Sequence, residues 1–121
     1  QEQGVVFTEG IFDIDVLNNI RHFSYLYFHG HSVGGTNPSL LEAMASSCLM
    51  AAHNNAFNKA ILETEAFYFS NPNEVAEIIS TNTKDENHPW IKANRGKITE
   101  KYTWQAIVDG YAKVIEELYN E

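Results

Sequence analysis

The part of the sequence best suited to binding a ligand is the glycine-rich segment GHSVGGTN. Its residues Gly30, Gly34 and Gly35 allow a tight turn and let a ligand approach the backbone closely. Asn37 and Pro38 then favour a helix start, because Asn is a strong N-cap and Pro is tolerated at the first helical position. A glycine loop that opens onto a helix N-terminus directs free N–H groups at an anion. In an α/β fold that anion is usually a phosphate, so the segment predicts a nucleotide site.

A second polar group lies further along the chain. His53, Asn54, Asn55 and Asn58 follow the short apolar run 49–52. If both segments follow parallel strands, they meet at the carboxyl edge of the sheet, where ligands of open α/β sheets bind. We therefore expect a second set of ligand contacts from this segment.

These segments need strands and helices to position them. Runs of β-branched, aromatic or apolar residues predict strands at 4–8, 25–28, 49–52 and 66–70. Capping residues and apolar spacing predict helices that begin at Asp13 or Asp15, at Pro38 and at Pro72, and a long amphipathic helix over 104–119 capped by Thr103. Residues 53–59 and 80–88 read as loops, 60–63 as a helical turn and 90–101 as a weakly patterned helix. Strands that alternate with helices predict an α/β fold, a Rossmann-like parallel sheet with flanking helices.

Size and composition set limits on the class of protein. The 121 residues predict a single domain, and the net charge of −8 argues against a nucleic-acid-binding surface. Cys48 is the only cysteine, which excludes a disulfide framework. No apolar run approaches the ~20 residues that span a bilayer, and no signal peptide is visible, so we expect a cytoplasmic location. The chain begins without Met, which suggests an excised fragment or, as the alternative, a processed protein.

Several residues also have simpler interpretations. His29 and His31 form an H-x-H pair that could bind a metal with His22 or His53, but no carboxylate completes a ligand set, so we predict neither a metal nor a cofactor. Cys48 is expected to be a small core residue. The apolar stripe over 104–119 is expected to lie in the core or in a domain interface.

The string GGTNPSLLE, continued by Ala43, Met44 and Ala45, resembles the donor-binding half of a GT-B glycosyltransferase. The resemblance is to the retaining superfamily that includes glycogen synthase and sucrose synthase. The longer string FHGHSVGGTNPSLLEAM, with HNNAFNKAIL, AFYFS and KYTWQAIVDGYAKVIEEL, is similar to bacterial rhamnosyltransferases of surface polysaccharide synthesis.

This resemblance implies transfer of a sugar from a nucleoside diphosphate, with dTDP-rhamnose as the suggested donor, to a sugar or lipid-linked sugar acceptor. It assigns Glu42 to the hydroxyl groups of the nucleotide sugar, since a carboxylate accepts from two hydroxyl donors at once. The remaining donor contacts are expected from His31, Gly34, Gly35, Thr36, Asn37, His53, Asn54, Asn55 and Asn58.

Two departures from the family pattern stand out. Many relatives carry a second glutamate in the glycine loop, and its position here is occupied by Gly34. No Arg or Lys matches the pair that neutralises the leaving pyrophosphate, and the acceptor domain with its catalytic groups has no counterpart. We therefore expect part of a transferase, inactive on its own, whose full-length form works in the cytoplasm or at the inner face of the membrane.

Two other classes remain open. The first is a non-catalytic α/β nucleotide-binding or interaction module. Independently of the class of protein, the simpler interpretation of Glu42 is a solvated helix residue. The second, a receiver-like signalling domain, ranks low because GVVFTEG offers only Glu9 near the end of the first predicted strand. Without further strands the edge at 25–28 would be open, so we expect either pairing with Val5–Thr8 or a dimer through that edge.

Overall fold

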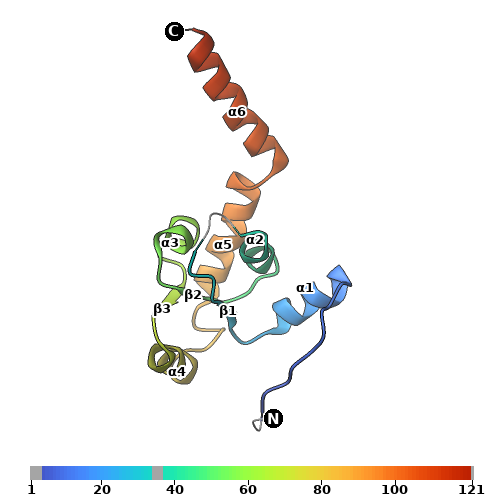
Figure 1. The fold of residues 1–121 in the computed structure, drawn as a ribbon, viewed down its shortest axis with the longest axis vertical. Helices are drawn as coiled ribbons and strands as arrows, with labels where there is room; N and C mark the ends of the chain where they lie inside the picture. Colours follow the sequence, from blue (N-terminus) through green and yellow to red (C-terminus); the bar gives the residue numbers. More distant parts are fainter. Residues whose placement is uncertain (1–3, 34–36, 121) are drawn as a thin grey trace.

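A three-stranded parallel sheet forms the centre of the protein (Figure 1). The computed structural model describes residues 4–33 and 37–120. The strands are β1 (Tyr27–His29), β2 (Met50–His53) and β3 (Phe67–Phe69), and they lie side by side in chain order. Tyr27 lies opposite Met50, and Ala51 opposite Phe67. The predicted α/β class with a parallel sheet flanked by helices is confirmed.

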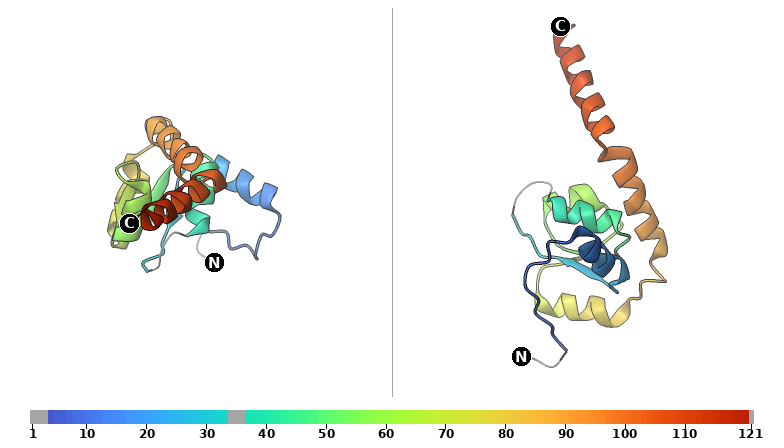
Figure 2. Two further views of the ribbon diagram at one scale, coloured as in Figure 1. Left: turned by 90° about the horizontal axis from the view of Figure 1, so that it is seen from above. Right: turned by 90° about the vertical axis from the view of Figure 1, so that its right-hand side faces the viewer.

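Helices separate the strands and complete the chain. They are α1 (Ile14–Phe23), α2 (Pro38–Ala45), α3 (Ala56–Leu62), α4 (Pro72–Thr81), α5 (His88–Lys101) and α6 (Trp104–Tyr119). Helix α2 contacts both α1 and α5, and α4 lies next to β3. Helix α6 extends away from the sheet, as Figures 1 and 2 show.

Side-chain caps begin most of these helices. The Asp13 carboxylate accepts from the backbone N–H groups of Asp15 and Val16. Asn71 caps α4 and Thr103 caps α6 in the same way. These caps satisfy backbone donors that have no partner within the helix, which confirms the helix starts predicted from sequence.

The core lies between α2 and the sheet. Leu40 and Met44 of α2 pack with Met50 of β2 and Leu62 of α3, and all four are fully buried. Burial of each such side chain contributes about 2 kcal/mol relative to exposure. Cys48 is buried beside them, as predicted. This core fixes the start of α2 relative to the ends of β1 and β2.

Two local predictions were wrong. Residues 4–8 form no strand, and Val6 and Phe7 are about four-fifths exposed. β-favouring residues form a strand only where a neighbouring strand pairs with them, and in the described residues β1 pairs with β2 alone. Residues 56–59 were expected in a loop but begin α3, because the Asn55 side chain caps that helix.

The apolar stripe of α6 is not part of the core. No residue of α6 is buried, and Trp104 is 84% exposed. The expectation of a core helix is therefore wrong for the described residues, whereas a role in a domain interface stays a prediction. Within the described ranges, no helix combines the length and apolar character needed to cross a membrane.

Candidate functional site at the carboxyl edge of the sheet

Two asparagine side chains join the loops that follow β1 and β2. The side-chain amide of Asn55 donates to the His31 carbonyl oxygen at 3.0 Å. The amide of Asn58 donates to the same oxygen at 3.2 Å and to the His53 carbonyl oxygen at 2.9 Å. Asn58 is buried, so these bonds are shielded from water. The structure thus brings four of the predicted site residues together at one edge of the sheet.

The asparagines are themselves committed to the fold. The Asn55 side-chain oxygen accepts from the Asn58 N–H at 2.8 Å and caps α3. Asn54 is exposed, and its backbone N–H donates to the Phe69 carbonyl at 2.8 Å. Asn55 and Asn58 therefore position the neighbouring histidines, whereas His31 and Asn54 are exposed and His53 is half-buried.

His29 lies beneath His31 at the end of β1. Its side chain is 2% exposed, and the two imidazole rings stack with their centroids 4.6 Å apart. Burial, and to a smaller extent the charge of His31, holds the pKa of His29 below its usual value, so the ring is neutral at pH 7. Its Nε2 atom is buried and has no hydrogen-bond partner in the described part of the chain. His29 thus supports the ring of His31 from inside the protein and does not itself line the hollow described next.

A small hollow lies beside these histidines, between the ends of β2 and β3. Its volume is about 330 Å³, and its walls include His53, Phe69, Asn71 and Val75. The His53 and Phe69 rings meet edge to face with centroids 6.1 Å apart. Apolar walls with a few polar groups are typical of small-molecule sites. The sequence predicted a strand over 66–70 and a helix cap at Asn71. It did not indicate that Phe69 and Asn71 would line a hollow.

Helix α2 begins after β1, and its first residues follow the segment 30–37 that was predicted to bind an anion. The Asn37 side chain accepts from the Ser39 N–H at 2.9 Å and from the Ser39 hydroxyl at 2.6 Å, so Asn37 is a helix cap as predicted. The predicted contacts of Gly34, Gly35 and Thr36 lie outside the described residues.

Glu42 lies one turn along α2 and is paired with a cation. Its Oε2 atom is 2.8 Å from an Arg21 guanidinium nitrogen of α1. The Arg21 side chain is 7% exposed and the Glu42 side chain 46%. The pair links α1 to α2 and holds the Glu42 carboxylate toward α1. The sequence did not indicate Arg21 as a partner of Glu42.

The arrangement can bind a ligand through ring nitrogens, an aromatic wall and a helix start. In the described ranges, no group of three or more His, Cys, Asp or Glu side chains could hold a metal ion. Comparison of the chain with protein-family models, with curated proteins and with solved structures gave no match.

Proposed function

We propose that the carboxyl edge of the sheet binds a nucleoside diphosphate sugar and that the chain is the donor-binding part of a bacterial glycosyltransferase. The observation that supports this most is the joining of the loops after β1 and β2 by Asn55 and Asn58. Because these bonds hold His31 and His53 together beside the start of α2, a ligand across the edge meets a preformed surface.

Each part of the edge suits a different part of such a ligand. The start of α2 favours the pyrophosphate, because its backbone N–H groups and the helix dipole attract anions. The hollow beside His53 and Phe69 suits the base, which stacks on aromatic rings. Glu42 is the carboxylate that the resemblance assigns to the sugar hydroxyls. The specific donor that we propose is a nucleoside diphosphate rhamnose.

In the complete reaction, a sugar moves from the nucleoside diphosphate to an acceptor hydroxyl. The leaving diphosphate gains negative charge as the glycosidic bond breaks. Helix N–H groups placed at that charge would stabilise the transition state electrostatically. This edge would supply the leaving-group half of the reaction, whereas the groups that activate the acceptor are expected elsewhere in the full-length enzyme.

A non-catalytic nucleotide-binding module is the second candidate. The ion pair between Glu42 and Arg21 favours it, because a carboxylate already paired at 2.8 Å has less capacity for sugar hydroxyls. The two candidates differ in one measurable respect. A donor domain binds the nucleotide sugar more tightly than the nucleoside diphosphate alone, whereas a module that reads only the nucleotide binds both equally.

Calorimetric titration with dTDP, UDP and GDP and with their sugars tests the proposal. We expect one nucleotide series to bind, its sugar form more tightly, and His53→Ala to weaken binding about tenfold through lost contacts in the hollow. His88→Ala is the matched control, because His88 is exposed at the start of α5, outside the site. Absence of binding by all ligands to folded protein, or weakening by His88→Ala alone, would overturn the proposal.

A further inference from the structure

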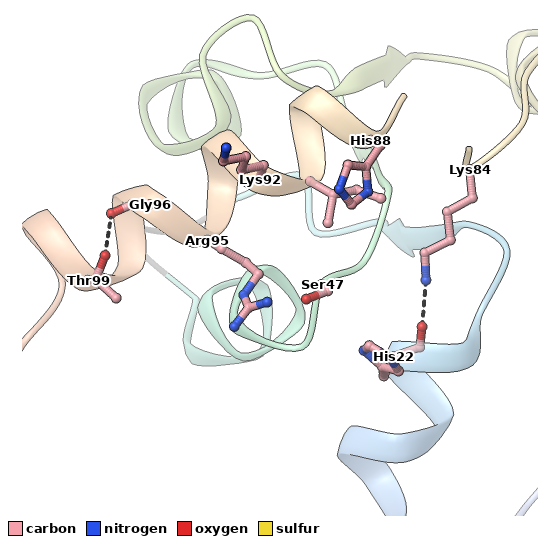
Figure 3. A pocket seen from close by; sticks show the side chains of 9 residues that line it. His22, Ser47, Lys84, His88, Lys92, Arg95, Gly96 and Thr99 are labelled. Atoms are coloured by element: carbon pink, nitrogen blue, oxygen red, sulfur yellow. Dashed lines mark hydrogen bonds between the residues drawn. The ribbon is translucent and has the colours of Figure 1, made fainter. Parts of the chain in front are cut away.

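A second and larger hollow lies away from the carboxyl edge. Its volume is about 610 Å³, and it lies among the end of α1, the turn before β2, Lys84 and one side of α5 from His88 to Thr99 (Figure 3). His22 precedes β1 and Ser47 precedes β2, so the hollow lies toward the amino-terminal edge of the sheet. The nucleotide-sugar site proposed above and this hollow are therefore at opposite edges and can be occupied independently.

The lining of this hollow is basic in a protein that is acidic overall. It includes three of the eight Lys and Arg residues and two of the five His residues, namely His22, Lys84, His88, Lys92 and Arg95. None of its lining residues is Asp or Glu, although the chain has sixteen acidic residues. Asp85 and Glu86 follow Lys84 in the sequence but do not line the hollow. The hollow is thus a local positive site that would attract an anion.

The cations of the hollow are not neutralised by the protein. Other basic residues form the ion pairs of the described chain, whereas neither Lys92 nor Arg95 has one. Lys84 donates to the carbonyl oxygens of His22 and Ser24 at 2.5 and 3.2 Å, but these acceptors carry no net charge. Figure 3 shows the Arg95 guanidinium extending from α5 toward Ser47. A guanidinium in this position can bind phosphate oxygens through two parallel hydrogen bonds.

The hollow also has an apolar side. Ile91 of α5 is 4% exposed and forms part of the wall, next to the backbone at Gly96. The Thr99 hydroxyl is occupied, since it donates to the Gly96 carbonyl oxygen at 2.9 Å. A site with cations on one side and an apolar wall on the other suits a charged group attached to a carbon skeleton. The volume falls within the range of small-molecule pockets.

We propose that this hollow binds a phosphomonoester, with Arg95 holding the phosphate group, Lys84 and Lys92 contributing positive charge and the His88 ring offering a hydrogen bond. A soluble sugar phosphate and the head group of phosphatidic acid share this chemistry, because each carries a terminal phosphomonoester. The first would be a small ligand of the protein, and the second would bring this face to a membrane surface.

The test is an NMR titration of the 15N-labelled chain with inorganic phosphate and ribose 5-phosphate, beside flotation with phosphatidylcholine vesicles that contain or lack phosphatidic acid. We expect shift changes at residues 88–99 and an affinity about tenfold lower in Arg95→Gln, which removes the charge-assisted bonds. Lys113→Gln removes the same charge from exposed α6 and should change affinity less than about twofold.

The outcomes separate the two sources. Binding of the soluble phosphates that depends on Arg95 supports a small ligand. Flotation that requires phosphatidic acid and that Arg95→Gln abolishes, without binding of the soluble phosphates, supports a phospholipid head group. Because Arg95 is exposed, its variant should melt as the unmodified chain does. Absence of binding in both assays, or equal weakening by Arg95→Gln and Lys113→Gln, would overturn the proposal. Neither result depends on nucleotide-sugar binding at the opposite edge.

Discussion

The side-chain amide of Asn58 serves two carbonyl oxygens, those of His31 and His53, that belong to loops after different strands. Because the Asn58 amide is buried, we expect it to affect ligand binding only indirectly, by holding His31 and His53 in place. The sequence indicated a polar segment at the right place but gave no means of separating the asparagines that support the site from the side chains that face a ligand. That division depends on contacts with a loop distant in the sequence.

Substitution of Glu42 is the most direct test of the role proposed for a single residue, because Glu42 is expected both to bind the sugar and to pair with Arg21. We expect Glu42→Ala to lower affinity for the nucleotide sugar by about 1–3 kcal/mol, the range for hydrogen bonds to a charged group. It should also lower the free energy of unfolding by about 2 kcal/mol, because Arg21 is left buried without its carboxylate partner, a cost reduced by the partial exposure of Glu42. Calorimetry and urea unfolding measure the two effects separately.

Arg21→Met is the matched variant, because it breaks the same ion pair and leaves the carboxylate of Glu42 in place. It should lower stability and preserve affinity. Equal affinity of Glu42→Ala and the unmodified chain would remove Glu42 from the site and favour a purely structural ion pair.

A partly buried ion pair, between Lys97 and Glu65, predicts how stability varies with pH. Lys97 is buried, and its Nζ atom donates to a Glu65 carboxylate oxygen at 2.8 Å, to the Leu62 carbonyl at 2.9 Å and to the Asn94 side chain at 3.2 Å. The bond from Lys97 holds the pKa of Glu65 below its usual value. The ion pair therefore contributes its full stabilisation above the ordinary glutamate pKa of about 4.3. This contribution is lost as the pH falls through the lower pKa that Glu65 has in the folded state.

We accordingly expect Glu65→Gln to destabilise the protein at pH 7 and to have a much smaller effect at pH 3, as measured by urea unfolding. Glu100→Gln serves as the control, because Glu100 is exposed on α5, the helix that carries Lys97, and has no ion pair within the described residues. A difference in stability between Glu65→Gln and the unmodified chain that is equal at both pH values would contradict this account.

At the scale of elements, capping chemistry was the most reliable guide. Asp13, Asn37, Asn71 and Thr103 all begin helices, since each cap depends only on residues within one turn. The same signal at Asn55 could have revealed α3, but the polar run HNNAFNK was interpreted as a loop. The predicted strand at 4–8 was wrong because a strand depends on a partner that local sequence does not specify.

Helix α6 leads to a prediction about this element alone. It has 16 residues, none of them buried, and an isolated helix of such length is only marginally stable in water. A chain that ends at Thr103 should therefore keep its melting temperature within about 3 °C, since Ile98 and Tyr102, which pack on the core, are retained. Calorimetric melting tests this, and loss of cooperative unfolding would show that α6 stabilises the core.

For the whole molecule, the edge of β1 decides whether copies associate. In the described chain β1 pairs only with β2, and the Tyr27 N–H donates to the Leu49 carbonyl at 2.9 Å. Alternate residues of a parallel strand bond to the same side, so the Phe28 N–H faces the open edge. We expect concentration-dependent dimers through this edge in sedimentation velocity.

Two substitutions at one position isolate that N–H group. Phe28→Pro removes it without breaking the ladder to β2, whereas Phe28→Ala removes the ring and keeps the N–H. Dimers should persist in Phe28→Ala and disappear in Phe28→Pro. A monomer at every concentration, or equal behaviour of the two variants, would exclude association through this edge.

The distribution of residues along the chain explains which surfaces the sequence revealed. The carboxyl edge was predictable because each of its polar segments directly follows a strand. The basic hollow was not, since His22, Ser47, Lys84 and Arg95 come from four separate parts of the sequence. The net charge of −8 did not indicate the basic hollow either, because a total charge does not show where the cations cluster.

The most direct test of the central claim is to locate the nucleotide sugar by NMR on the 15N-labelled chain. Titration with the nucleotide sugar that binds most tightly should shift the amides of residues 29–33, 53–58 and 69–71, which border the carboxyl edge. Residues 88–99 should remain unchanged. Shifts confined to residues 88–99, or no shifts at saturating ligand, would contradict a donor site at the carboxyl edge of the sheet.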